Sequence, residues 1–285
     1  MNGIVRKFPL SLDGRPIYVR EGSPDRETID WVLVQENYAF VEQDVPDPRL
    51  IVDCGAYAGY STLYFLTAYP NARVIALEPD ERNFELCRRN LLHYGDRVTL
   101  MHAAVWPEPA ELVLRKGELG DRRQWGTAVR LPRPGEKTDV RGVDVPEILR
   151  ASGFAVIDLL KLDIVTSEEV LFSRNHERWL PRVKNILLGL NEKAGEDAFF
   201  GALSGFQFFL ARRPSVVACT RMAPAVRTAG LDSPRQARNA VANGGFENLR
   251  VEAGRVDSTG WIAGSTDVAA SWHVVVRDPQ FHVDL

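Results

Sequence analysis

The chain has 285 residues, of which 45% are hydrophobic and 26% are charged, and its formal net charge is −3. These values are typical of a globular protein and exclude intrinsic disorder as the main state of the chain. A balance this close to neutral gives no electrostatic reason to expect nucleic acid or an anionic membrane as the partner. The three cysteines are widely spaced, which disfavours both a disulfide framework and a zinc ribbon.

Neither a secretory leader nor a membrane span is predicted. Residues 1–15 contain no apolar stretch of signal-peptide length, and no run of 18 apolar residues occurs anywhere in the sequence. Together with the odd number of cysteines, these features predict a reducing, cytoplasmic compartment and no membrane partner.

The N-terminal residues 1–44 are expected to form a hairpin and a helix that lead into the core. Short alternating apolar stretches predict the β-hairpin, with its turn around Asp13 and Gly14. Asp25 follows as the expected N-cap of a helix that runs to about Asn37. Two prolines then interrupt the chain before the main pattern begins.

Between residues 45 and 222, short apolar strands alternate with helical segments. The strands are predicted over residues 50–53, 74–77, 98–105, 156–163, 183–190, 206–211 and 215–218. The helices are predicted over residues 61–68, after an N-cap at Asp80, and over 143–149, 167–172 and 196–203. Such alternation predicts an α/β fold with a doubly wound, mostly parallel seven-stranded sheet. The last two strands are expected to close it as an antiparallel pair.

The composition changes near residue 222, so residues 223–285 are expected to form a separate C-terminal β-rich appendage. Residues 243–249 read NGGFENL, and Trp261 and Trp272 follow in β-favouring surroundings. Three interpretations of this segment stay open. It is a β-arm for dimerisation, a lid over a ligand pocket, or the vestige of a fused carbohydrate-binding module.

The most informative motif runs from Val52 to Thr62 and reads VDCGAYAGYST. An acid, Asp53, ends a predicted strand, and Gly55 and Gly59 bend the backbone into a tight turn that opens a helix. Because the tip is acidic and no Gly-Lys-Ser/Thr follows, the spacing excludes a P-loop and makes dinucleotide binding the weaker interpretation. The alternative is an ordinary strand-to-helix turn.

A second acid, Glu78, follows the next predicted strand, 25 residues after Asp53. In a doubly wound sheet this position lies beside the glycine turn, where a carboxylate accepts hydrogen bonds from both ribose hydroxyls of a nucleoside. Taken alone, Glu78 is equally well explained as an acid that caps the helix ahead of Asp80. Together with Asp53, Gly55 and Gly59 it forms a pattern typical of S-adenosylmethionine binding.

Four sequence blocks resemble those of FkbM-type S-adenosylmethionine-dependent methyltransferases. The blocks are IVDCGAYAGYSTLYF, VIALEPDERNFELCRRNL, LMHAAVW and VIDLLKLDIVTSEEVLF, and the resemblance covers about residues 15–212. Members of this family are mostly O-methyltransferases that act on natural products and sugars. The resemblance therefore implies a methyltransferase fold and S-adenosylmethionine as the cofactor.

The resemblance also implies where the cofactor binds. The residues expected to contact it are Asp53, Gly55, Tyr57, Gly59, Glu78, Ala103, Ala104 and Asp163. The first turn would surround the methionine end, Glu78 would hold the ribose, and the two alanines would lie near the adenine. The family commonly carries Asn where Tyr57 stands, and Tyr57 is expected to shape the mouth of the pocket.

On the acceptor side the sequence departs from the family. The fourth strand of the family usually carries the pattern K-x-D-x-E-G-x-E. This chain keeps the first and last acids, Asp163 and Glu168. The middle Glu is replaced by Val165 and the Gly by Thr166. The next strand usually ends near E-x-H, whereas residues 189–191 here are Gly-Leu-Asn. The sequence therefore supports cofactor binding better than it supports methyl transfer.

Three polar residues are candidates for acceptor chemistry. Asp163 ends a central strand, where open α/β sheets bind their ligands, and it would orient the acceptor or take its proton. Asn191 would hydrogen-bond the acceptor but cannot act as a general base. His102 is the only histidine near the predicted site, and a structural role is its alternative. A hard-cation site made of Asp163, Glu168 and Asn191 is also open, although we expect no metal because one family carboxylate is lost.

The sequence thus predicts a methyltransferase that methylates an oxygen atom of a small natural product or its sugar. The expected partner is this small-molecule acceptor, with a homodimer through the appendage as a further prediction and with neither nucleic acid nor membrane expected. Two alternatives stay open. One is another use of the sulfonium, such as cyclisation or elimination, and the other is a non-catalytic cofactor-binding role in a biosynthetic pathway.

Overall fold

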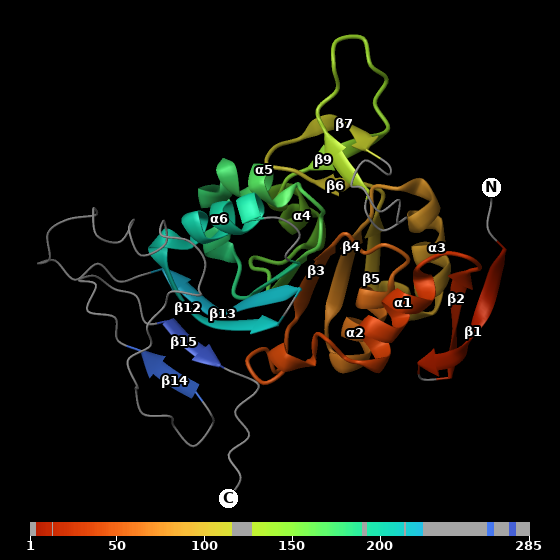
Figure 1. Cartoon of the computed structure of the whole chain (residues 1–285), viewed down its shortest axis with the longest axis horizontal. Coiled ribbons are helices and arrows are strands. Elements are labelled where there is room, and N and C mark those ends of the chain that lie inside the picture. Colours follow the sequence, from red (N-terminus) through yellow and green to blue (C-terminus); the bar gives the residue numbers. More distant parts are fainter. Residues whose placement is uncertain are drawn as a thin grey trace, which may run out of the picture.

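The computed structural model describes residues 4–12, 14–115, 127–189, 193–213, 215–224, 261–264 and 274–277. A nine-stranded sheet forms the centre of the molecule (Figure 1), and its strands lie in the order β14-β15-β12-β13-β11-β10-β3-β4-β5. Their bounds are β3 Leu50–Cys54, β4 Arg73–Leu77, β5 Val98–Met101, β10 Leu159–Leu162, β11 Ile186–Gly189, β12 Phe206–Arg213, β13 Val216–Pro224, β14 Trp261–Gly264 and β15 Val274–Arg277.

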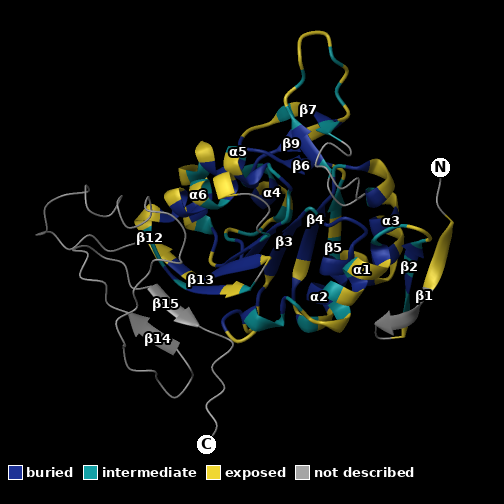
Figure 2. Ribbon diagram, in the orientation of Figure 1, coloured by how far each residue is buried: buried dark blue, intermediate teal, exposed yellow. Residues whose placement is uncertain are grey.

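The seven strands from β12 to β5 form the doubly wound sheet that the sequence predicts. Strands β11, β10, β3, β4 and β5 run parallel to one another. Strand β13 is antiparallel to both β11 and β12, so the predicted antiparallel closing pair is confirmed. All residues of β3 and β10 are buried, which is the mark of parallel strands covered on both faces. Figure 2 shows these central strands as the most buried part of the chain.

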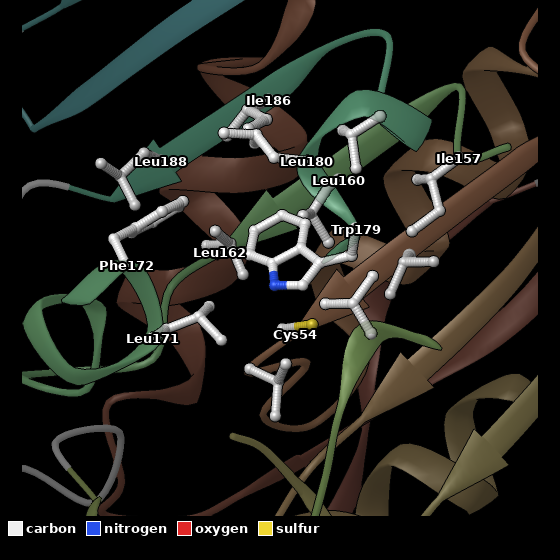
Figure 3. Close-up of a cluster of buried hydrophobic side chains, with 14 of the residues drawn as sticks. Cys54, Ile157, Leu160, Leu162, Leu171, Phe172, Trp179, Leu180, Ile186 and Leu188 are labelled. Atoms are coloured by element: carbon white, nitrogen blue, oxygen red, sulfur yellow. The ribbon is translucent and has the colours of Figure 1, made fainter. Parts of the chain in front are cut away.

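Helices cover both faces of this sheet. One face carries α2 (Tyr60–Ala68) and α3 (Glu81–Leu91), and the other carries α4 (Val145–Ser152), α5 (Glu168–Ser173) and α6 (Lys193–Ala202). Successive residues of a strand point to opposite faces. Thus Ile51 and Leu159 pack with the first pair of helices, while Leu160 and Leu162 pack under the second group. Figure 3 shows the latter cluster gathered around the buried indole of Trp179.

The N-terminal hairpin is confirmed, with strands β1 (Val5–Leu12) and β2 (Arg15–Arg20). The next helix is shorter than expected, because α1 (Asp25–Ile29) passes into a single π-helical stretch over residues 30–34. The prediction that Asp25 caps this helix is wrong. The N-cap is Pro24, and the fully buried carboxylate of Asp25 instead binds the guanidinium of Arg20, with a shortest distance of 2.8 Å. Because charge-assisted hydrogen bonds are strong, both carboxylate oxygens of Asp25 bind the Arg20 side chain and do not cap the helix.

The predicted strand over 98–105 is split in the structure. Strand β5 ends at Met101, and the chain turns before β6 (Ala104–Val105) enters a separate four-stranded sheet of order β6-β9-β7-β8. The other members are β7 (Ala110–Arg115), β8 (Ala128–Arg130) and β9 (Val140–Val143), none of which the sequence predicts. This small sheet projects above the carboxyl ends of the central strands (Figure 1).

Strands β14 and β15 extend the central sheet beyond β12. Strand β15 pairs in parallel with β12, from Phe208 opposite Val274 onward, and β14 pairs antiparallel with β15. The division of the chain at residues 45 and 223 stays a prediction.

Among the described residues, no helix is both long and apolar enough to cross a bilayer.

Removal of residues 225–285 tests that division. Strand β12 keeps β13 as its neighbour on one side, so the seven-stranded sheet remains complete and becomes open only at its β12 edge. We expect the shortened chain to unfold cooperatively, with a thermal midpoint within a few degrees of that of the full chain. If the appendage forms the homodimer, the shortened chain should elute from a sizing column as a monomer and the full chain as a dimer. Loss of cooperative unfolding would show that the appendage belongs to the core.

Candidate functional site

A cavity of about 440 Å³ opens at the carboxyl ends of strands β3, β4, β10 and β11. This is the edge at which open α/β sheets bind ligands, and the volume lies within the range of about 300–1,000 Å³ usual for small-molecule sites. Its wall comes from the glycine turn after β3, the end of β4, the turn before β6, the loop after β10, and the residues that precede β3.

Most of the residues predicted to form the site lie together in this wall. Six of them line the cavity: Gly55, Tyr57, Glu78, Ala103, Ala104 and Asp163. Three others, Asp53, Gly59 and His102, are not part of the lining. Asn191 lies outside the described residues, so its predicted role in acceptor binding stays a prediction.

Gly55 has a position that no other residue type can occupy without a backbone shift. Its φ is +78°, and a Cβ built there would lie 1.9 Å from the carbonyl oxygen of Asp163. The turn after β3 and the loop after β10 therefore touch backbone to backbone. Gly59 has a different role, since it precedes α2 with φ +88° and a Cβ there would lie 3.1 Å from Cys87 Sγ. Its absent side chain permits the close packing of α2 and α3.

Asp53 is fully buried beneath the turn and forms an ion pair with Lys161. The Nζ of Lys161 lies 2.8 Å from Asp53 Oδ1 and 3.0 Å from the carbonyl oxygen of Gly55. The hydroxyls of Ser61 and Thr62 each donate to Asp53 Oδ2 at 2.7 Å. Burial is the largest single influence and on its own would lower the pKa of Lys161, but Asp53, Tyr38 and Asp163 together outweigh burial and raise the pKa. Asp53 thus holds the turn in place, and its contact with a ligand stays a prediction.

Glu78 is 5% exposed and presents its carboxylate at the cavity wall. One oxygen accepts from the backbone N–H of Tyr57 at 2.9 Å, and the other accepts from the backbone N–H of Asp80 at 2.9 Å. Asp80 is also the N-cap of α3, as the sequence predicts. Burial is the main influence on Glu78 and raises its pKa to about 7. The carboxyl is therefore poised to gain from any ligand that donates hydrogen bonds to its ionised form.

A network of polar side chains ties the N-terminal residues to Glu78. Arg20 donates to both oxygens of Asp25 and, through its other terminal nitrogen, to Asn83 Oδ1 at 2.7 Å. Asn83 in turn donates to Glu78 at 3.3 Å. The hydroxyl of Tyr57 donates to Asp25 at 2.5 Å, which closes the circuit. We name these five residues the Arg20 network.

Asp163 is half-buried, lines the cavity, and has no hydrogen-bond partner for its carboxylate among the described residues. The two residues that replace the Glu-Gly of the family follow shortly after it. Val165 has φ +36° and Thr166 has φ +62°, although both are β-branched. Such residues rarely adopt positive φ, at a cost of order 1–3 kcal/mol each, and they occur mainly at functional sites. The backbone thus keeps a shape suited to glycine. On the next strand, a Cβ at Gly189 would lie 2.9 Å from Asp163 Oδ1.

His102 lies apart from this arrangement. Its side chain is exposed, Nε2 is 3.0 Å from the carbonyl oxygen of Pro79, and its ring lies 5.0 Å from that of Phe84. These contacts suit the structural alternative, and a catalytic role for His102 stays a prediction. Within the described part of the chain, no three His, Cys, Asp or Glu side chains are placed to share a metal ion. The prediction that the protein needs no metal ion stays a prediction.

Sequence reasoning missed one whole wall of the cavity. It is formed by residues 15–45, which we name the N-terminal segment, and its lining members include Glu27, Thr28, Trp31 and Tyr38. Sequence reasoning also gave no role to Lys161, although its motif was noted. The available signal was a single lysine inside an otherwise apolar strand, because such a charge is buried only opposite a carboxylate.

Comparison with known proteins identifies a family for part of the chain. Residues 53–169 match the model of the methyltransferase FkbM domain. The ribosomal RNA small subunit methyltransferase H of Streptomyces avermitilis is 37% identical over 87 residues, which span 30% of this chain but only 27% of that protein. Methyltransferase sdnD of Sordaria araneosa is 26% identical over 183 residues, or 53% of this chain and 70% of that one.

A crystal structure of a methyltransferase from Geobacter sulfurreducens is also similar in part. It is 19% identical, with a TM-score of 0.38, over 71% of this chain and 91% of that one. The motif blocks recognised in the sequence fall largely within the matched region, from the glycine turn to the start of α5. The chain therefore carries, over residues 53–169, a methyltransferase domain of the FkbM family.

Proposed function

We propose that this protein uses S-adenosylmethionine to methylate an oxygen atom of a small natural product or its sugar. The observation that carries the proposal is a cavity, lined mostly by residues of the FkbM domain, that presents the carboxylates of Glu78 and Asp163, which follow strands β4 and β10 on either side of β3. The family and the fold imply the cofactor, and the size of the cavity, about 440 Å³, supports a small-molecule acceptor.

The residues present fit this cofactor. Glu78 follows β4 at the position where doubly wound folds bind the ribose hydroxyls of nucleosides. Its two oxygens are held by backbone donors, which leaves their remaining lone pairs for a ligand. The carboxylate of Asp163 has no partner in the described structure and suits a ligand that carries positive charge.

When bound, S-adenosylmethionine supplies a methyl group that its sulfonium has already activated. The chain then has to hold the acceptor oxygen in line with the methyl–sulfur bond, and such orientation provides most of the acceleration. Asp163 lies at the cavity wall where it orients the acceptor hydroxyl and accepts its proton as the oxygen gains the methyl group. Val165 adds an apolar surface beside it, because its side chain is 7% exposed and lines the same cavity.

Val165 also supports a second candidate. It stands where the family usually carries a carboxylate, so the acceptor side has lost a charged group that could act as a base. The alternative is therefore a different use of the sulfonium, by cyclisation or elimination, or a binding role without turnover. The products separate these functions: S-adenosylhomocysteine indicates methyl transfer, methylthioadenosine indicates the altered chemistry, and neither product indicates a binding role.

Replacement of Glu78 by glutamine tests the cofactor site. We expect S-adenosylmethionine to bind about tenfold or more weakly to Glu78→Gln, because a hydrogen bond to a charged group contributes about 1.5–3 kcal/mol. In the unchanged protein, affinity should fall as the pH drops below about 7, since protonation removes acceptors from the ribose site. Binding near neutral pH should then release protons, which calorimetry in two buffers of different ionisation enthalpy measures.

The matched control is Glu85→Gln, which removes a carboxylate from the exposed face of α3, the helix that begins three residues after Glu78. It should change neither the affinity nor the proton release. The ligand-free protein supplies an independent check on sign. The raised pKa of Glu78 means that the folded state binds the extra proton, so Glu78 should reduce stability as the pH rises from about 4.5 through 7. Unchanged affinity and unchanged pH dependence in Glu78→Gln would remove Glu78 from the ribose site.

A further inference from the structure

Tyr38 lies in the N-terminal segment, outside the residues that match the FkbM domain. Its side chain is 3% exposed and lines the cavity. The ring is held from three sides, because it stacks on Phe65 at 5.6 Å and meets the edges of Trp31 at 5.1 Å and Tyr64 at 5.9 Å. Such packing fixes the direction of the hydroxyl group.

The hydroxyl of Tyr38 has no hydrogen-bond partner among the described residues, although nine-tenths of the residue and more is buried. Because Tyr38 lines the cavity, a ligand bound there can accept a hydrogen bond from this hydroxyl. Burial dominates its environment and raises the pKa of Tyr38, and the charges of Lys161, Asp163 and Asp53 also act on this hydroxyl. Tyr38 therefore stays neutral and serves as a hydrogen-bond donor.

Lys161 offers a second donor at the same place. An ammonium group carries three N–H donors, and two of them are used by Asp53 and by the carbonyl oxygen of Gly55. The third has no partner in the described structure. Among the described residues that line the cavity, Lys161 is the only one with a positively charged side chain, whereas Glu27, Glu78 and Asp163 are acidic. Among these lining residues, Lys161 is therefore the counter-charge available to a negatively charged ligand group, although it also pairs with Asp53.

The cofactor named in the proposed function carries one negatively charged group, the carboxylate of its methionine part. We propose that the Tyr38 hydroxyl and the Lys161 ammonium together bind this carboxylate, so that a residue outside the FkbM domain completes the cofactor site. The inference rests on the proposed function and adds to it a carboxylate subsite at the glycine turn, where Lys161 already contacts Gly55.

Two ligands that differ in the amino-acid part test the subsite. S-adenosylhomocysteine keeps the carboxylate, whereas methylthioadenosine lacks the whole amino-acid portion. We expect Tyr38→Phe to weaken S-adenosylhomocysteine binding about tenfold or more and to change methylthioadenosine binding less than twofold, measured by calorimetry. The phenylalanine keeps the ring contacts with Phe65 and Trp31, so the affinity for methylthioadenosine also reports that the adenosine half of the site is intact.

Tyr69→Phe is the matched control, because Tyr69 is 4% exposed, its hydroxyl is buried without a partner, and it does not line the cavity. This variant should bind both ligands as the unchanged protein does. Equal weakening of both ligands by Tyr38→Phe would overturn the proposal, since the ring and not the hydroxyl would then matter. Unchanged binding of S-adenosylhomocysteine would overturn it as well. Failure of the unchanged protein to bind S-adenosylhomocysteine would instead overturn the proposed function itself.

Discussion

Replacement of Lys161 by methionine is expected to destabilise the protein by about 3–5 kcal/mol, because it leaves the buried carboxyl group of Asp53 without its charged partner. The pair is shielded from water, with side-chain exposures of 3% for Lys161 and 0% for Asp53. The two hydroxyls that also bind Asp53 compensate only part of the lost charge. Denaturant unfolding followed by fluorescence measures the change, and it should appear as a lower midpoint with an unchanged slope.

Lys184 provides the matched control. Its Nζ lies 2.7 Å from Asp158 Oδ1, a distance close to that of the buried pair, but its side chain is 57% exposed. Solvent screening reduces the value of such a pair to about 0–1 kcal/mol. Lys184→Met should therefore cost at most about a third of what Lys161→Met costs. Comparable losses in the two variants would mean that burial does not govern the strength of the Asp53 pair.

Gly55→Ala should abolish cofactor binding and lower the stability of the fold. The new methyl group would lie 1.9 Å from the carbonyl oxygen of Asp163, a backbone atom that cannot rotate away. Strands β3 and β10 pair directly at this point, with Cys54 opposite Leu162, so relief of the clash has to separate their carboxyl ends. Thermal melting and a titration with S-adenosylmethionine measure the two effects.

Gly153→Ala separates the clash from the backbone preference. Gly153 has φ +73°, close to that of Gly55, but a Cβ there would meet no atom within 4 Å. The control should therefore show only the cost of a left-handed alanine, about 1 kcal/mol, and should keep full affinity for the cofactor. Retention of cofactor binding in Gly55→Ala would show that the two strand ends tolerate separation.

The central strands could be predicted because each combines burial on both faces with a short apolar run. The small sheet could not be predicted for the opposite reason. Strand β6 has only two residues, and only two of the six residues of β7 are buried, so neither shows a clear period. The false continuation of β5 into residues 104–105 has the same origin, since apolar residues on both sides of the turn resemble one strand.

The candidate site divides in a similar way. Residues at strand ends, such as Glu78 and Asp163, could be predicted because the topology of a parallel sheet brings those ends to one edge. Tyr38 could not, because it precedes a single turn of 3₁₀ helix and its position depends on the rings that surround it. The N-cap prediction for Asp25 was wrong for a related reason. An acid at the start of a helix is usually its cap, and only the folded chain shows that the carboxylate binds Arg20 instead.

The Arg20 network has a consequence for how such proteins diverge. Its bonds cross the boundary at residue 53, joining Arg20 and Asp25 on one side to Tyr57 and Asn83 on the other. A chimera that exchanges only residues 53–169 with a relative would therefore keep the Arg20–Asp25 ion pair but replace the block that supplies Asn83 and Tyr57, the partners of that pair. Exchange of residues 15–169 as one block would keep the circuit whole. The unit that has to be exchanged as a whole therefore begins at the N-terminal segment, and substitutions at positions 20, 25, 57 and 83 should covary among related proteins.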